Sequence, residues 1–144
     1  MPCKYVIAMD GNVVVELWTG TVTFDELMAH KKQLICDSAI NAGASVLSDC
    51  TRAVFAISPD AISELSEMEN DPHNRPRIRR YAFLVRNDVY DRAQQFAHRV
   101  DKYGKSVIIF NSLEVACTWL GIDLLKTREL MDSFGAGVFR DPSA

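Results

Sequence analysis

Short apolar runs rich in β-branched residues alternate with amphipathic segments along most of this 144-residue chain. The runs are typical of buried strands, and the segments between them have the spacing of helices. Strands that alternate with helices of about ten residues predict a sheet with helical cover and right-handed crossovers between parallel strands. The alternation therefore predicts an α/β fold with a mixed sheet of about five strands.

The stretch YVIAMDGNVVVELW, residues 5–18, predicts a β-hairpin at the N-terminus. Two β-branched runs flank Asp10, Gly11 and Asn12, and glycine and asparagine accept the positive φ angles that tight turns need. The hairpin contributes an antiparallel pair of strands, whereas each later crossover brings the next strand in parallel. Later strands are expected at residues 44–50, 80–85 and 106–110.

The first helix is expected to begin after Thr23, because Glu26 follows at the spacing of a capping box. Apolar residues then recur with a helical period as far as Ile35. This period leaves three polar residues on the more exposed side: His30, Lys31 and Lys32. Later helices are expected at residues 60–68, 88–100 and 113–120. Ser112 caps the last of these helices and Gly121 closes it.

Residues 1–121 are predicted to form one domain, followed by a C-terminal tail at 122–144 that is partly helical. A chain of this length buries a sizeable core without disulfides. The tail carries a partial helical stripe of apolar residues: Leu124, Leu125, Met131 and Phe134. Such a stripe docks either on its own domain or on a second copy of the chain, and the sequence leaves both open.

Composition argues against several classes of function. The chain has 48% hydrophobic residues, 24% charged residues and a net charge of −3, which give no overall attraction to nucleic acid or an anionic membrane. It shows no signal peptide and no run of about 18 apolar residues, so a cytoplasmic protein without membrane insertion is expected. The four cysteines form no C-x-x-C pair and have no histidine at metal-ligand spacing, so neither a metal nor a cofactor is predicted.

Two stretches carry a resemblance to a known family: GTVTFDEL at the first helix and VIIFNSLEVACTWL at the last. With the order of elements, they resemble the SpoIIAA-like, or STAS, fold family over roughly residues 5–120. More narrowly, the chain is similar to a bacterial branch of largely unassigned SpoIIAA-like proteins. In that branch a final strand is followed by the sequence pattern Phe-x-Ser-x-x-x-Ala-x-x-Trp-Leu. The residues that match this pattern here are Phe110, Ser112, Ala116, Trp119 and Leu120. The resemblance implies a SpoIIAA-like mixed sheet.

The resemblance also implies a site at Ser58. Members of the anti-sigma-factor-antagonist type carry a phosphorylatable serine in an Asp-Ser-Ser-Gly turn after the central strand, and phosphorylation by a kinase partner releases a bound partner. This chain departs from that turn, because Ile57, Pro59 and Asp60 replace the acid, the second serine and the glycine. Ser58 is therefore either a plain helix cap or a switch whose phosphate would meet free N–H groups but be repelled by Asp60.

Other candidate binding residues follow from position and charge. Asp49 ends the central strand, and ligands of α/β sheets gather at the carboxyl ends of strands; its plainer role is to accept hydrogen bonds from the following turn. An arginine set could bind a phosphate, a carboxylate or an acidic partner, or could simply form a solvated strand entrance. It comprises Arg75, Arg77, Arg79 and Arg80.

These observations favour a non-catalytic regulatory or protein-interaction module that binds a protein partner or its own copy. The surface expected to bind comprises the region around Ser58, the helix at residues 60–68 and the loop that faces them. The alternative is a carrier of a small anionic molecule or a lipid, which would need a large apolar pocket with arginines at its mouth. An enzyme would need a pocket that joins Asp49 to a histidine and an arginine.

Overall fold

The computed structural model describes residues 3–69, 78–86, 88, 90, 91, 94, 97, 98 and 106–134. Five strands form one sheet, whose order across the sheet follows the chain order. They are β1 (Cys3–Ala8), β2 (Val13–Thr23), β3 (Ala44–Ala56), β4 (Ile78–Leu84) and β5 (Ser106–Phe110). β1 and β2 are antiparallel, and the pairs from β2 to β5 are all parallel. The predicted mixed sheet is confirmed.

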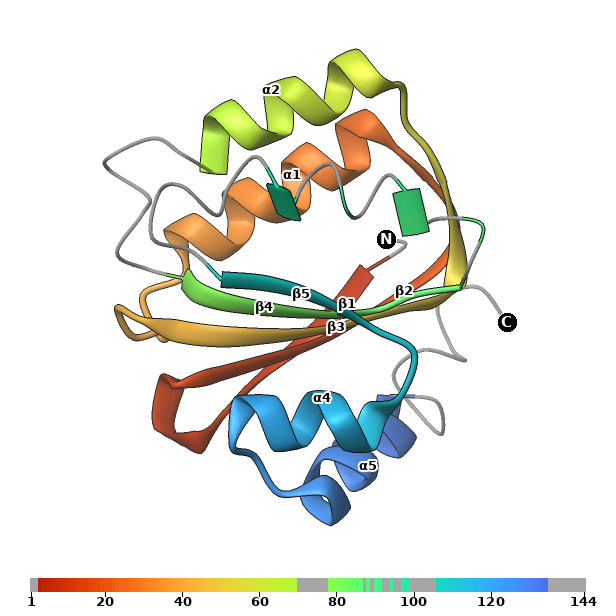
Figure 1. Ribbon diagram of the computed structural model, residues 1–144. Coiled ribbons are helices and arrows are strands. Elements are labelled where there is room, and N and C mark those ends of the chain that lie inside the picture. Colours follow the sequence, from red (N-terminus) through yellow and green to blue (C-terminus); the bar gives the residue numbers. More distant parts are fainter. Residues whose placement is uncertain are drawn as a thin grey trace.

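Helices cover both faces of the sheet (Figure 1). One face carries α1 (Phe24–Cys36) and α2 (Pro59–Glu69), and the other carries α4 (Leu113–Leu120) and α5 (Leu124–Ser133). A short 3-10 turn, Met9–Gly11, joins the two strands of the N-terminal hairpin. Among the described residues, no helix is long and apolar enough to cross a bilayer.

The predicted helix boundaries of α1 and α4 are confirmed by their caps. The backbone N–H of Glu26 donates to Thr23 Oγ1 at 3.3 Å, and the backbone N–H of Thr23 donates to Glu26 Oε1 at 2.9 Å. This reciprocal pair is the expected capping box. At α4 the Ser112 hydroxyl accepts from the N–H of Val115 at 3.4 Å, and Gly121 ends the helix in the left-handed region.

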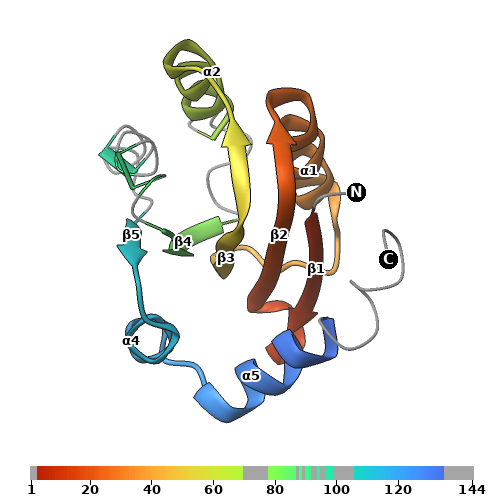
Figure 2. The same cartoon turned by 90° about the vertical axis from the view of Figure 1, so that its right-hand side faces the viewer.

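β2 and β3 continue together past the end of β4. β4 pairs with β3 only as far as Asp49, whereas the residues 19–23 of β2 pair with residues 52–56 of β3. Figure 2 shows the two strands running on side by side towards α1 and α2. We call this two-stranded segment the β2–β3 extension.

The Arg86 side chain pairs with the free edge of this extension. Its Nη1 donates to the carbonyl oxygen of Thr51 at 2.7 Å, and its Nη2 donates to that of Ala53 at 2.8 Å. Its Nε lies 3.0 Å from Oδ1 of Asp88, which completes an ion pair. The guanidinium therefore takes hydrogen bonds that a longer β4 would have made, which discourages pairing of this edge with another chain.

Two predictions about burial are wrong. His30 and Lys31 are only 1% and 3% exposed, because the inward stripe of α1 runs through Leu27, His30, Lys31 and Leu34. This stripe has the i, i+3, i+4, i+7 spacing of a core-facing helix side. Leu125 is 68% exposed rather than inward, whereas Phe134 is buried together with residues of β2 and α4.

Candidate functional site

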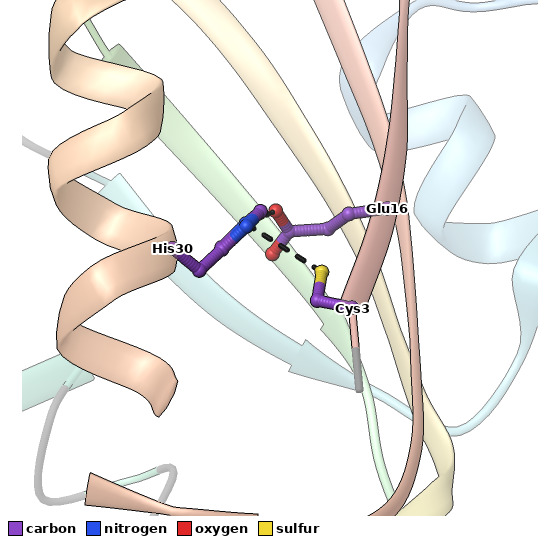
Figure 3. Close-up of side chains that lie close together, drawn as sticks. All are labelled: Cys3, Glu16 and His30. Atoms are coloured by element: carbon purple, nitrogen blue, oxygen red, sulfur yellow. Dashed lines mark hydrogen bonds and ion pairs between the residues drawn. The ribbon is translucent and has the colours of Figure 1, made fainter. Parts of the chain in front are cut away.

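A buried cluster of three side chains lies between the sheet and α1: Cys3, Glu16 and His30. Cys3 pairs with Trp18 across the hairpin, and residues two apart on a strand share a face, so Cys3 and Glu16 lie on the same side of the sheet. α1 covers this side and brings His30 to them (Figure 3). Three separate elements therefore build the cluster.

The Glu16 carboxylate and the Cys3 sulfur both lie close to the same nitrogen of the His30 imidazole. His30 Nε2 lies 2.6 Å from Glu16 Oε2 and 3.6 Å from Cys3 Sγ. Because a carboxylate only accepts hydrogen bonds, the Nε2–H of His30 donates to Glu16. The indole N–H of Trp18 donates to the other carboxylate oxygen at 3.2 Å. Glu16 is 1% exposed, so these contacts replace its hydration.

The cluster holds Glu16 in its charged form. Burial by itself raises the pKa of this carboxyl, but the interaction with His30 and the charge of Lys31 outweigh burial and hold the pKa well below its usual value. The Lys31 ammonium lies over the ring of Tyr81, 4.6 Å from its centre. A buried carboxylate is therefore balanced by cationic and hydrogen-bonding neighbours.

The geometry does not suit a cysteine nucleophile. Burial and the charge of Glu16 raise the pKa of the Cys3 thiol far above its usual value, so the thiol stays protonated. In addition, Cys3 and Glu16 both contact Nε2 of His30, whereas a nucleophile–histidine–acid triad uses both ring nitrogens. The sulfur, nitrogen and oxygen atoms nevertheless lie within 4.8 Å of one another, which is an arrangement that could hold a metal ion.

A cleft of about 250 Å³ lies on the opposite side of the sheet, next to α5. It is lined by Leu17, Asp49, Arg52, Leu113, Arg128, Met131 and Asp132. Ligand pockets usually have volumes of about 300–1,000 Å³ and mostly apolar walls. The small volume and the four charged residues do not favour a lipid carrier.

Asp49 accepts hydrogen bonds from a residue shortly after it in the chain, which is the plainer of its two predicted roles. Its Oδ1 accepts from the N–H of Thr51 at 2.9 Å and from the Thr51 hydroxyl at 2.6 Å. The cleft also brings Asp49 together with Arg52 and Arg128, which were not among the predicted arginines. Among the described residues that line the cleft there is no histidine.

Ser58 lies at the start of α2 and is exposed, as is Asp60. The N–H of Ala61 donates to Ser58 Oγ at 3.2 Å, which is the contact of a helix cap. Phosphorylation of this hydroxyl stays a prediction.

The structure describes two residues of the predicted arginine set, Arg79 and Arg80. Arg75 and Arg77 lie outside the described residues. Arg79 and Arg80 are neighbours in β4 at a register shift, where Ile78 pairs with Ala44 and Arg80 pairs with Ser45 of β3. Arg79 is exposed, whereas Arg80 Nη1 donates to the carbonyl oxygen of Trp119 at 3.3 Å and its guanidinium lies over the Trp119 ring.

Sequence reasoning missed the buried cluster, because its members come from β1, β2 and α1 and form no short motif. One signal could have pointed to it. His30 and Lys31 stand at the i+3 and i+4 positions from Leu27, with Leu34 at i+7, so the inward stripe contains two polar residues. Polar residues at core positions need buried partners, and Glu16, within the apolar run of residues 13–18, is a carboxylate that can serve as one.

No protein-family model and no curated protein matches the chain. Six chains of known structure match it. One is the crystal structure of an uncharacterized protein from the DUF3478 family with a SpoIIAA-like fold, from Shewanella loihica PV-4. The chain has a SpoIIAA-like fold. The TM-score is 0.50, the identity is 15%, and the alignment covers 82% of this chain and 93% of that chain. At this identity the likeness shows the fold alone, and the predicted SpoIIAA-like fold is confirmed.

Proposed function

We propose that this protein is a non-catalytic regulatory module that binds a protein partner at the N-terminal end of α2. The observation that supports this proposal is the exposed hydroxyl of Ser58, which caps α2 immediately after β3 in a SpoIIAA-like fold. The family resemblance implies a phosphorylatable serine at this position. The proposal makes Ser58 both a helix cap and the point at which partner binding is regulated.

The chemistry of the helix start supports a switch that acts through charge. A phosphoryl group on Ser58 Oγ would lie near the N–H of Ala61, which is 3.2 Å from that oxygen, and near the positive end of the helix dipole. It would add a charge of about −1.5 to −2 beside the exposed carboxylate of Asp60. A partner that docks on the unmodified surface would then meet concentrated negative charge and dissociate.

Exposed residues of the β2–β3 extension could add to a partner-binding surface, because β3 ends two residues before Ser58. Arg52 and Val54 are two apart on β3 and both exposed, and Val54 is 52% exposed. Thr21 pairs with Val54 on the neighbouring strand and is also exposed. An arginine, a threonine and a valine side by side suit a mixed polar and apolar protein contact.

The test compares wild type, Ser58→Ala and Ser58→Asp, after cross-linking in the organism of origin has identified a partner. We expect Ser58→Ala to keep the partner and to lose about 1 kcal/mol of folding free energy with the cap. Ser58→Asp should stay folded, because aspartate also caps helices, and should bind the partner at least about tenfold more weakly. Intact-mass and peptide analysis of the natural protein should place a phosphate on Ser58.

Two results would contradict the proposal. In the first, Ser58→Asp binds the purified partner with the affinity of wild type. In the second, the natural protein cross-links to no other protein and to no second copy, and carries no phosphate on Ser58 under any growth condition. Co-purification of a small molecule in place of a partner would instead support the carrier.

A further inference from the structure

We propose that Cys3, Glu16 and His30 form a metal site that binds zinc or a similar thiophilic divalent ion. The site goes beyond the proposed partner binding, because it lies beneath α1 and uses none of the residues around Ser58. The evidence is the convergence of three different ligand atoms on one buried point, from β1, β2 and α1 (Figure 3).

The ligand set selects the class of ion. A cysteine sulfur, a histidine nitrogen and a glutamate oxygen are the three ligand types that zinc takes in proteins. Calcium and magnesium take oxygen ligands almost alone, so the sulfur and the imidazole argue against both. Three protein ligands leave a fourth tetrahedral position for water or another small ligand.

The distances from the His30 nitrogen to the other two ligand atoms are close to what zinc needs. Zinc bonds of about 2.3 Å to sulfur and about 2.0–2.2 Å to nitrogen and oxygen place sulfur and nitrogen roughly 3.6 Å apart around a tetrahedral centre, and nitrogen and oxygen roughly 3.4 Å apart. Cys3 Sγ lies 3.6 Å from His30 Nε2, so this pair already has the required separation. Glu16 Oε2, at 2.6 Å from the same nitrogen, must move away by somewhat less than about 1 Å.

The charges also permit binding of a divalent cation. A bound zinc ion displaces the proton of a coordinating thiol. On binding, Cys3 releases its proton to solvent, and the Nε2 proton of His30 either moves to Nδ1 or is released. The thiolate and the Glu16 carboxylate then offset the two positive charges of the ion. The buried ammonium of Lys31 repels a metal ion bound nearby. The negative charges of both the thiolate and the carboxylate are therefore required for the ion to bind.

Metal binding would fasten the edge of the sheet. Among the described strands β1 pairs with β2 alone, and Cys3 is its first residue. An ion held by Cys3, Glu16 and His30 ties this edge strand to β2 and to α1 at the same point. Because metal binding to the folded state stabilises it, the zinc-loaded protein should melt at a higher temperature than the metal-free protein.

Cobalt titration of the metal-free wild-type protein is the first test, because Co²⁺ occupies zinc sites and is coloured. We expect one equivalent of Co²⁺ to produce a thiolate-to-cobalt absorption band in the near ultraviolet and the visible bands of a four-coordinate ion, and zinc to remove both. Cys3→Ser should abolish the thiolate band. Cys36→Ser is the matched control, because Cys36 is an exposed cysteine on the same helix as His30, and this variant should keep the band.

A second measurement keeps the test decisive if Cys3→Ser does not fold. X-ray absorption fine structure of zinc-loaded wild type should show one sulfur and otherwise nitrogen or oxygen neighbours. The proposal is overturned by the absence of a cobalt–thiolate band in folded wild type, by a band that persists in folded Cys3→Ser, or by a zinc ion with no sulfur neighbour or with more than one.

Discussion

At the scale of single residues, Glu16 is the carboxylate that joins the polar side chains of the buried cluster. It accepts from His30 and from Trp18, and it offsets the charge of Lys31. His30 and Lys31 are themselves buried, so removal of the carboxylate charge weakens the partner of His30 and takes a countercharge from Lys31. Buried ion pairs of this kind add little net stability when intact, but are costly to break from one side.

Glu16→Gln should therefore lower the free energy of unfolding by about 3 kcal/mol in metal-free buffer. Glu129→Gln is the control, because Glu129 is exposed on α5, and it should change stability by less than about 0.5 kcal/mol. Urea unfolding of both variants measures the difference. Equal stabilities would show that the carboxylate charge is not needed in the core.

Asp88 and Arg86 give a prediction about pH. The hydrogen bonds from Arg86 lower the pKa of the Asp88 carboxyl below its usual value. A lowered folded-state pKa contributes stability above the unfolded pKa of about 3.9, and this contribution is lost as the pH falls through the folded value. Carboxyl NMR should find the pKa of Asp88 below about 3.9 in wild type and close to it in Arg86→Gln. Arg128→Gln, on α5, should leave the pKa of Asp88 where it is in wild type.

At the scale of elements, the N-terminal hairpin is held by a close backbone approach at its turn. Gly11 has a φ angle of 94°, and its carbonyl oxygen accepts from the N–H of Asn41 at 2.8 Å. A Cβ atom at Gly11 would lie 2.5 Å from the carbonyl oxygen of Ala39. The turn therefore packs directly against the loop between α1 and β3.

Gly11→Ala should be more costly than Gly43→Ala. Gly43 also has a positive φ, of 81°, but an added Cβ there meets nothing within 4 Å. Gly43→Ala carries only the backbone strain of about 1–2 kcal/mol. Gly11→Ala adds the contact with Ala39, and should lose about 1–3 kcal/mol more. Thermal unfolding of both variants measures this difference, and equal midpoints would show that the hairpin turn moves away freely.

At the scale of the whole molecule, the described part of the tail completes the core on one face of the sheet. α5 packs beside α4 against β2, and Phe134 at its end is buried with residues of both. The sequence left open whether the tail would dock on its own domain or on a second copy. In this structure it packs on its own domain, and the same packing forms one wall of the cleft beside Asp49.

Phe134→Ala should lower the free energy of unfolding by about 3–5 kcal/mol, because it leaves a cavity between α5 and the sheet. Leu125→Ala is the control, because Leu125 is exposed on the same helix, and it should have an effect below about 0.5 kcal/mol. Urea unfolding at several protein concentrations distinguishes docking within one chain from docking between copies. A loss of stability that appears only at high concentration would indicate a second copy.

Local sequence patterns predicted the order of the described strands and helices and the starts of α1 and α4. They did not predict the ends of β2 and β3, which continue to Thr23 and Ala56 instead of ending at Trp18 and Cys50. The hairpin at Gly11, the capping box from Thr23 to Glu26 and the Ser112 cap each depend on residues close together in the chain, so spacing alone predicts them. The hydrophobic periods then predicted the mixed sheet, because strands with intervening helices have few ways to pack. These features need no knowledge of distant contacts.

Only the tertiary structure decided where the polar side chains lie. Cys3, Glu16 and His30 belong to three elements, and their meeting depends on strand register and on the rotation of α1 about its axis. His30 was predicted on the exposed side because it is polar, and a polar residue at an inward position is stable only with a buried partner. That partner, Glu16, lies on a different element. Burial and partnership are properties of the packed molecule, and a local pattern does not contain them.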